Sequence, residues 1–436
     1  MSFIVQLRII MGDDMVRRKC IPDRSPMSQS PSPQPPHPVA QPVPVTVTLA
    51  ILGASSLTVM ANATIAPALP GLRDHFADTP GIETLAGLIL SLPSLFVVLT
   101  AGVFGLLADR FDKRPLLICA MAVYAIGGAS GLYVDGMMGL LIGRVLLGLG
   151  VAGSMTVASA YIGTIWQGAA RDKFTGLQVA SMNLGGIVFM TSGGLLAVAH
   201  WRLPFAIYLI AIPLMAYAWI ALANVPGRVG AASGAGAGDG PPASDGFPWA
   251  AFLWVGPFAF ILMVSFYTLP TRLPFLLADR AIGGPAATGL ILSASTLASI
   301  PGALGYGRIR RFASPMTIMA VGFFVSSIGM AIVATTQSLP VMVAGVMLAG
   351  GPMGMMFPNF IAFFMGLVPM QMRGRAAGLF TMSVFGGQFI SPLVSAPLIA
   401  RFGLGGGMLA MAVLPVLAGL FITVMFKRAP QQPIQV

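Results

Sequence analysis

The stretch that decides the fold is "GLLADRFDKR" (Gly105–Arg114), which places five charged residues within six positions of an otherwise apolar chain. Apolar runs long enough to cross a membrane, at about 18 residues or more, lie on both sides of it. Only 8% of the 436 residues are charged and 56% are hydrophobic, whereas about a quarter of the residues in a soluble domain are charged. The chain is therefore an integral membrane protein, and the stretch is a loop between two spans.

Working outward from this loop, the apolar runs predict an all-α protein with twelve membrane-spanning helices. A β-barrel is excluded because the runs are continuous rather than alternating. The predicted spans are 45–66, 86–107, 115–134, 137–162, 176–198, 204–224, 249–269, 285–306, 315–335, 339–363, 377–399 and 404–426.

The polar segments divide the chain into two groups of six helices. Residues 1–44 are polar and Pro-rich and predict a disordered cytoplasmic tail, in which Met27 is an alternative start to Met1. One six-helix half occupies 45–224 and the other 249–426. Between them, the Gly-rich segment 225–248 predicts a flexible cytoplasmic linker, and 427–436 predicts a second cytoplasmic tail.

The basic residues predict the orientation of these spans. With a cytoplasmic N-terminus, eighteen of the 24 Lys and Arg residues lie inside, and Arg144 lies within the membrane. The five that remain outside are Arg73, Arg202, Arg272, Arg280 and Arg401. This asymmetry follows the positive-inside rule, so both termini are expected in the cytoplasm. The net charge of +11 thus reflects topology and does not indicate a nucleic-acid partner.

The two halves carry an internal repeat. "RDKFTGLQVASMNLGG" from Arg171 and "RGRAAGLFTMSVFGGQ" from Arg373 share Arg, Gly-Leu, Ser and Gly at an offset of 202 positions. The loop at Gly105 has a counterpart in "GYGRIRR", which starts at Gly305 and again follows the second span of its half. Duplicated six-helix halves with the substrate site between them are a known transporter plan.

With these features, the loop resembles the pattern Gly-x-Leu-Ala-Asp-Arg-x-Gly-Arg-Lys between helices 2 and 3 of the major facilitator superfamily. The resemblance is to the twelve-helix drug:proton antiporter-like branch. It implies two pseudo-symmetric six-helix halves that transport a small molecule by alternating access. The matching residues are Gly105, Leu107, Ala108, Asp109, Arg110, Lys113 and Arg114.

The resemblance implies that this loop takes part in gating. Asp109 is expected to approach the positive N-terminal end of a helix in the other half, and Arg110 to pair across the same boundary. For Lys113 and Arg114 the alternative is that they only anchor the loop at the cytoplasmic face. Asp112 stands where the family has Gly, and we expect it to tolerate the positive-φ turn that Gly would favour.

A second match is "GRVLLGLG" in the fourth span, which resembles the family signature Arg-x-x-x-Gly-x-Gly through Arg144, Gly148 and Gly150. A charge inside a membrane is costly and is commonly functional, so Arg144 is predicted to couple protons or contact substrate charge. The alternative is that it extends to the outer surface. Gly148, Gly150 and Gly153 predict close helix packing.

A third, weaker match lies in the fifth span. The antiporter branch carries Gly-x-x-x-Gly-Pro-x-x-Gly-Gly there, and "GGIVFMTSGG" keeps Gly185, Gly193 and Gly194. Phe189 and Met190 replace the Gly-Pro pair. The loss of this pair weakens the case for strict antiport.

The acidic residues limit the substrate and the coupling chemistry. None of the thirteen falls at the middle of a predicted span, which disfavours small hydrophilic cations as substrates. If protons drive transport, the candidate carriers are Asp109 and Glu83, acting through Arg144. The sequence contains no Walker A loop and no cluster of metal ligands, so neither ATP nor a metal cofactor is expected.

A few polar residues in the predicted spans are candidates for the substrate cavity alongside Arg144. They are Asn62, Gln178, Asn183, Tyr267, Asn359 and Gln388. Each could instead form a hydrogen bond between helices. Pro352 and Pro358 predict kinks in the tenth span.

Together these features predict a secondary active transporter rather than an enzyme. The expected function is proton-driven efflux of small, largely apolar, neutral or anionic drugs or metabolites, a multidrug-resistance type of activity. The alternative is a facilitator or importer of a sugar-like or organic-anion metabolite. The expected setting is a monomer in the lipid bilayer of a bacterial inner membrane, with a small-molecule substrate and no nucleic acid.

Overall fold

The computed structural model describes residues 43–166, 168–225 and 247–428. The predictions for the N-terminal tail, the central linker and the C-terminal tail fall almost wholly outside these residues. From Val45 onward the chain forms one compact unit built of helices.

The first half contains six membrane passes, several of them made of more than one helical segment. Its segments are α2 (Val45–Ala63), η1 (Ala66–Ala68), α3 (Leu69–His75), α4 (Ile82–Arg110), α5 (Lys113–Gly128), η2 (Ala129–Leu132), α6 (Met137–Ile165), α7 (Gly168–Ala199), η3 (Leu203–Ile210) and α8 (Ala211–Ala221). Helix α4 extends beyond the predicted span 86–107 at both ends, and α7 begins eight residues before the predicted span 176–198.

The second half repeats this order. Its segments are α9 (Trp249–Asp279), α10 (Pro285–Phe312), α11 (Pro315–Thr335), α12 (Leu339–Gly350), α13 (Met353–Gly366), η4 (Met370–Met372), α14 (Arg373–Met411) and α15 (Val413–Arg428). Helix α9 is ten residues longer than the predicted span 249–269 and continues through Pro270 and Pro274.

The described residues contain 11 helical stretches long and apolar enough to cross a membrane, where the sequence predicts twelve. The last stretch, Arg373–Met425, has 53 residues. At about 1.5 Å per residue it is more than twice as long as a hydrocarbon core of about 30 Å. Gly403 interrupts it with φ 71° and ψ 174°, between the predicted spans 377–399 and 404–426. The stretch therefore makes two passes, and the protein is an all-α membrane protein as predicted.

The predicted tenth span is interrupted at one of the two prolines that predicted kinks. Helix α12 ends at Gly350, and α13 begins after Pro352, whose ring cannot donate a backbone hydrogen bond. Pro358 lies inside α13 without ending it. The predicted kink is thus located at Pro352.

The duplication extends to the packing of equivalent atoms. In the first half, a Cβ added to Gly127 of α5 would lie 2.7 Å from the carbonyl oxygen of Gly143 in α6. In the second half, a Cβ added to Gly329 of α11 would lie 2.6 Å from the carbonyl oxygen of Gly345 in α12. Gly329 and Gly345 follow Gly127 and Gly143, respectively, by 202 positions. The structure confirms that the two halves are repeats.

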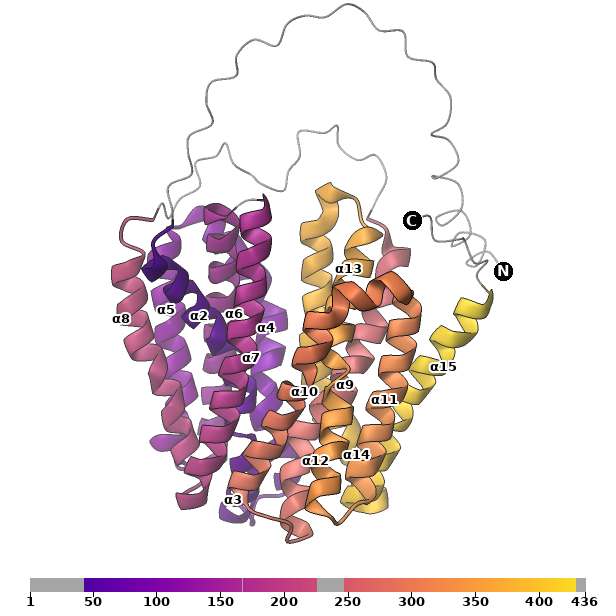
Figure 1. The fold of residues 1–436 in the computed structure, drawn as a ribbon. Coiled ribbons are helices and arrows are strands. Elements are labelled where there is room, and N and C mark those ends of the chain that lie inside the picture. The colour runs from indigo at the N-terminus through magenta and orange to yellow at the C-terminus, as the bar shows by residue number, and fades with distance from the viewer. Residues whose placement is uncertain (1–42, 167, 226–246, 429–436) are drawn as a thin grey trace, which may run out of the picture. The chain divides into compact units, whose positions relative to one another are not determined.

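Two pairs of helices join the halves. Helix α4 packs against α14, and α7 packs against α10, which lie side by side in Figure 1. We call these contacts the α4–α14 seam and the α7–α10 seam. In the first, a Cβ on Gly87 would lie 2.9 Å from Pro392 Cβ, and in the second Gly289 lies against the carbonyl of Met190. Gly289 and Pro392 follow Gly87 and Met190 by 202 positions, so the seams are equivalent.

The contacts between the halves favour one end of the bundle. We call this end, where α4 begins at Ile82 and α9 ends at Asp279, the closed end, and the opposite end the open end. Hydrogen bonds between the halves extend from Arg73 of α3 with Asp279 of α9, at the closed end, to Ser94 with Gln388, near the middle of α4. Toward the open end, Cβ atoms added to Gly176 of α7 and Gly378 of α14 would meet nothing within 4 Å.

Candidate functional site

The charged loop Gly105–Arg114 lies at the open end, where α4 gives way to α5. Asp109 and Arg110 are exposed in the last turn of α4. Neither side chain forms a hydrogen bond or an ion pair with any other residue in the described part of the chain. A Cβ on Gly105 would meet only Thr156 Cγ2, at 4.0 Å. The gating role of these three residues stays a prediction.

Asp112 does not occupy the positive-φ turn that we expected. Its φ is −64° and its ψ is 126°, and its carboxylate accepts a hydrogen bond from the backbone N–H of Arg114 at 3.0 Å. Extended backbone with a side-chain acceptor two residues before its donor defines a helix N-cap. The expectation was wrong because Asp112 begins α5 instead of turning the loop.

The two basic residues that follow lie within the first half. Arg114 donates through Nε and Nη2 to the carbonyl of Trp219 in α8, at 2.9 and 2.6 Å. Its guanidinium also stacks 3.8 Å above the centre of the Trp219 ring. Lys113, the first residue of α5, is buried. Arg114 therefore joins α5 to α8 within the first half, and both roles considered for Lys113 and Arg114 stay predictions.

Arg144 is fully buried inside the first half and does not extend to the surface. Its Nη2 donates to the carbonyls of Gly127 and Gly128 at 3.1 and 2.6 Å. A third acceptor is Ser130 Oγ, at 3.3 Å. These carbonyls end α5, where the helix dipole is negative, so the arginine neutralises a helix C-terminus.

Two tyrosines connect this arginine to α2. Tyr208 Oη accepts a hydrogen bond from Arg144 Nη1 at 3.5 Å and donates to the carbonyl of Ala61 at 3.0 Å. Tyr124 Oη donates to the carbonyl of Leu57 at 2.8 Å. The role of Arg144 in coupling stays a prediction, and the contacts of its guanidinium are with backbone carbonyls, hydroxyls and aromatic rings of its own half.

Sequence reasoning missed a second buried arginine, Arg272. We expected it in an outer loop, but it lies inside α9 with 1% of its surface exposed. Its Nε donates to Ser395 Oγ at 2.9 Å and its Nη2 to the carbonyl of Pro392 at 2.8 Å, both in α14. Its Nη1 donates to the carbonyl of Glu83 in α4 at 3.3 Å. Arg272 thus bonds to both halves.

Glu83 lies at the closed end, in the first turn of α4, and its side chain is exposed. With Arg272, Thr79, Thr84 and Ala396 it lines a recess of about 410 Å³. The structure therefore places Glu83 beside Arg272, whereas we expected it to act through Arg144.

Two of the predicted cavity residues form hydrogen bonds to α4 from the second half. Gln388 Oε1 accepts a hydrogen bond from Ser94 Oγ at 2.8 Å. The hydroxyl of Tyr267, in α9, donates to the carbonyl of Leu90 at 3.5 Å. Both side chains join the two halves through hydrogen bonds, which is the alternative that the sequence left open.

The remaining cavity candidates are divided between the halves. Gln178 of α7 donates to Ser55 Oγ of α2 at 2.9 Å. Asn183 is partly buried one and a half turns further along α7. Asn359 is fully buried in the second half and donates to the carbonyl of Pro315 at 3.0 Å. The side chain of Asn62 lies outside the described residues.

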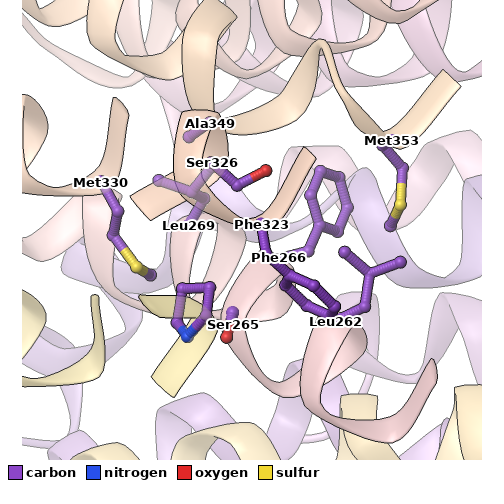
Figure 2. Close-up of a pocket in the computed structure, with 10 residues that line it drawn as sticks. Leu262, Ser265, Phe266, Leu269, Phe323, Ser326, Met330, Ala349 and Met353 are labelled. Carbon is purple, nitrogen blue, oxygen red and sulfur yellow. The ribbon is translucent and has the colours of Figure 1, made fainter. Parts of the chain in front are cut away.

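A small apolar pocket lies inside the second half (Figure 2). Leu262, Phe266, Phe323 and Met353 contribute to its wall, together with Ser265, whose buried hydroxyl has no partner among the described residues. Its free volume is about 10 Å³, which holds about one water molecule. It is too small to be a substrate cavity.

Within the described parts of the chain, no three His, Cys, Asp or Glu side chains gather closely enough to hold a metal ion. In those parts, the charged residues with less than a tenth of their surface exposed are Lys113, Arg144 and Arg272. The described carboxylates lie in loops or within a turn of a helix end, at positions such as Glu83, Asp109 and Asp279.

The duplicated six-helix halves and the charged loop after the second pass agree with the family comparison. The family model described as "Major Facilitator Superfamily" matches residues 51–392 and 255–435. The chain belongs to the Major Facilitator Superfamily. It is accordingly a multi-pass membrane protein of a transporter family, and not of an enzyme family.

Relatives with names show similarity over part of the chain. A tetracycline resistance protein, class C, of Escherichia coli is 32% identical over 36% of this chain and 39% of its own length. The bacillibactin exporter of Bacillus subtilis is 26% identical over 36% of this chain and 40% of its own length. The sialic acid transporter NanX of E. coli is 28% identical over 33% and 35%. The chain thus matches about two fifths of each relative's length.

Solved structures of this superfamily share the fold over nearly the whole chain. One is a bacterial homologue of the human lysosomal transporter Spinster in an inward-facing, occupied conformation. It gives a TM-score of 0.73 at 15% identity and covers 90% of this chain and 99% of its own. This likeness shows that the two chains share a fold.

Proposed function

We propose that the protein exports small, largely apolar, neutral or anionic compounds, driven by the proton gradient across a bacterial inner membrane. The observation that carries this proposal is the distribution of buried charge. Arg144 and Arg272 are buried within the spans, and the described carboxylates lie at helix ends or in loops. A cationic substrate would meet no opposing charge in such an interior, whereas an anion is attracted to it.

The proposed direction of transport rests on the orientation of the protein, on the end at which the halves are in contact, and on a named relative. The excess of basic residues at the open end supports a cytoplasmic location for that end and for both termini. The contacts between the halves near Ile82 and Asp279 leave the opposite end, next to the cytoplasm, as the side for substrate entry. The named exporter among the relatives supports outward movement. The protein is proposed to act as a monomer.

The test is transport by purified protein in proteoliposomes with an imposed pH gradient. Matched panels of neutral, anionic and cationic fluorescent compounds are compared. We expect gradient-driven movement of neutral and anionic compounds toward the closed-end side, with protons moving in the opposite direction. Transport that ignores the gradient would instead indicate a facilitator, and substrate movement in the same direction as protons would indicate an importer. A preference for cations would contradict the charge argument.

The proton carriers are tested in the same assay. Asp109→Asn and Glu83→Gln are each expected to reduce gradient-driven export at least tenfold, because a neutral amide cannot exchange a proton. Asp78→Asn is the matched control, since Asp78 is exposed in the loop before α4. If both variants export against a gradient at the rate of the unmodified protein, these carboxylates do not couple protons.

A further inference from the structure

The most unusual polar group in the structure is the Arg272 guanidinium at the closed end of the α4–α14 seam. Each of its three nitrogens donates a hydrogen bond, two to Ser395 and Pro392 in its own half and one to the Glu83 carbonyl in the other. Burying an arginine in a span is costly unless its donors are satisfied. This burial therefore depends on α4 staying against α9 and α14.

Separation of the halves at the closed end would change the surroundings of Arg272. The Glu83 carbonyl would move away with α4, and the contact of Gly87 with Pro392 would open beside it. The recess next to Arg272 already extends to Thr79, Thr84 and the Glu83 side chain, so it would widen onto the guanidinium. The hydrogen bond across the seam exists only while this end is closed.

The backbone around Arg272 allows this part of α9 to bend. Pro270 and Pro274 lie two residues on either side of it and have no backbone N–H. The carbonyls of Phe266 and Pro270 therefore lack their usual helical donors. A helix with two missing hydrogen bonds bends at lower cost than a regular one. Arg272 fixes the position of this weakened segment through its bonds to α4 and α14.

Arg280 provides a natural contrast at the same end. It follows α9 directly and donates to the carbonyls of Val333, Ala334 and Thr336 at the end of α11. Partial burial lowers the pKa of Arg280, yet a guanidinium stays charged at neutral pH. Its three acceptors belong to its own half, so its loss removes a comparable set of hydrogen bonds without touching either seam.

We propose that Arg272 is the positioning residue that holds the closed end shut, and that its bond to the Glu83 carbonyl sets how often the α4–α14 seam opens. The proposal follows from the transporter fold and not from the direction, substrate or coupling ion proposed above. Its test therefore measures the opening of the seam and involves no transport.

Ser91 supplies a reporter for this opening. It lies one turn after Gly87 on the same face of α4, is fully buried, and its hydroxyl has no partner among the described residues. Replacing its hydroxyl by a thiol therefore breaks no described hydrogen bond. Ser91→Cys is introduced into a background in which Cys20 and Cys119 are changed to Ser. A membrane-impermeant maleimide is then added at the closed-end face of the full-length protein in proteoliposomes.

We expect Arg272→Gln to raise the labelling rate of this cysteine about tenfold, the change expected when one hydrogen bond to a charged group is lost from the closed state. Arg280→Gln, the matched control, is expected to change it less than twofold. Equal rates with and without Arg272 overturn the proposal. An equal rise in both variants also overturns it, because the effect would then be general loosening.

A second variant covers the case in which Arg272→Gln is not recovered as a monodisperse protein. Arg272→Lys keeps the charge but has one donor nitrogen in place of three, so it cannot hold all three acceptors. It is expected to raise the labelling rate about threefold, less than Arg272→Gln does, because the single ammonium group replaces part of the lost hydrogen bonding. An unchanged rate in Arg272→Lys would overturn the proposal in the same way.

Discussion

The α4–α14 seam and the α7–α10 seam occupy equivalent positions in the two repeats, but they are built from different kinds of contact. The α7–α10 seam brings backbones together through small residues, with Gly194 against Gly289 and the carbonyls of Met190 and Pro285. The α4–α14 seam is joined by polar side chains, with Gln388 of α14 bound to Ser94 of α4 and, beside it, Arg272 of α9 bound to Glu83 of α4. Duplication fixed where the halves meet, and later substitutions changed what joins them.

This difference has a physical consequence for how each seam responds to change. Close backbone packing tolerates almost no added volume, because the neighbouring atoms cannot rotate away. Side-chain hydrogen bonds are individually weaker, with an average near 0.6 kcal/mol between membrane helices, but can be broken and re-formed. The α7–α10 seam is therefore expected to act as the rigid contact, and the α4–α14 seam as the one that opens.

The largest expected effect comes from adding one methyl group to each seam at equivalent positions. Gly289→Ala would press a Cβ against the Met190 carbonyl and lie 3.0 Å from Gly194 Cα, and we expect it to destabilise the protein by about 3 kcal/mol. In Gly87→Ala the added Cβ would lie 2.9 Å from the ring of Pro392 and 4.0 Å from Arg272 Nη2, both of them side chains, and the change should cost about 1 kcal/mol. Thermal unfolding in detergent, followed by tryptophan fluorescence, measures both.

The control for this comparison is Gly307→Ala in α10, where an added Cβ would meet nothing within 4 Å. It should be neutral or slightly stabilising, because alanine favours a helix over glycine by about 1 kcal/mol. Equal losses in Gly87→Ala and Gly289→Ala would show that the two seams are equally rigid.

An intermediate effect is expected from the hydrogen bonds across the seams. A double-mutant cycle of Ser94→Ala with Gln388→Leu should give a coupling energy of about 1 kcal/mol. The cycle of Thr191→Val with Ser293→Ala should give less than half of this. The reason is that the Ser293 hydroxyl also has the carbonyls of Ile187 and Gly289 as partners, so it remains satisfied without Thr191.

The thermal midpoints of the four single and two double variants measure these couplings. If the Thr191–Ser293 pair were coupled as strongly as Ser94–Gln388, hydrogen bonding would not distinguish the two seams.

The smallest effect is expected from the ion pair that joins the halves at the closed end. Arg73 Nη1 lies 3.2 Å from Asp279 Oδ1, and about half of the Asp279 side chain is exposed. Asp279→Asn should cost about 0.5 kcal/mol and lose this effect at high salt. It should also raise labelling of Ser91→Cys by less than twofold.

Asp135→Asn is the matched control for Asp279→Asn. It removes the ion pair with Arg202, at 2.6 Å, which lies wholly within the first half. A comparable loss of stability without any change in labelling is expected. A rise in labelling with Asp135→Asn would mean that surface charge, rather than the contact between halves, controls access.

The apolar runs predicted the number of membrane passes and their helical class, because the length of an apolar run can be read directly from the local sequence. The repeat was also readable, since it needs only a comparison of the chain with itself. The partners of Arg144 were not, because Gly127, Gly128 and Tyr208 are brought to it by folding. For the same reason, Gln388 could be recognised as polar but not as a bond between the halves.

Arg272 was misplaced for a specific reason. Pro270 and Pro274 predict the end of a helix, and in a soluble protein they commonly would end it. In a membrane, neighbouring helices can satisfy the freed carbonyls, so α9 continues to Asp279. The conformation of Asp112 was predicted wrongly because we assumed that it keeps the positive-φ turn of the glycine that the family has at this position. Its own tendency to begin a helix was the better guide.

The arginines at the ends of α5 and α11 show how the two repeats meet the same electrostatic requirement. Arg144 binds the last carbonyls of α5 from α6, and Arg280 binds those of α11 from the end of α9. The positions equivalent to them in the opposite repeats hold Val346 and Asp78. The two repeats therefore neutralise equivalent helix ends with arginines at non-equivalent positions, so the same electrostatic requirement is met by different residues in each half.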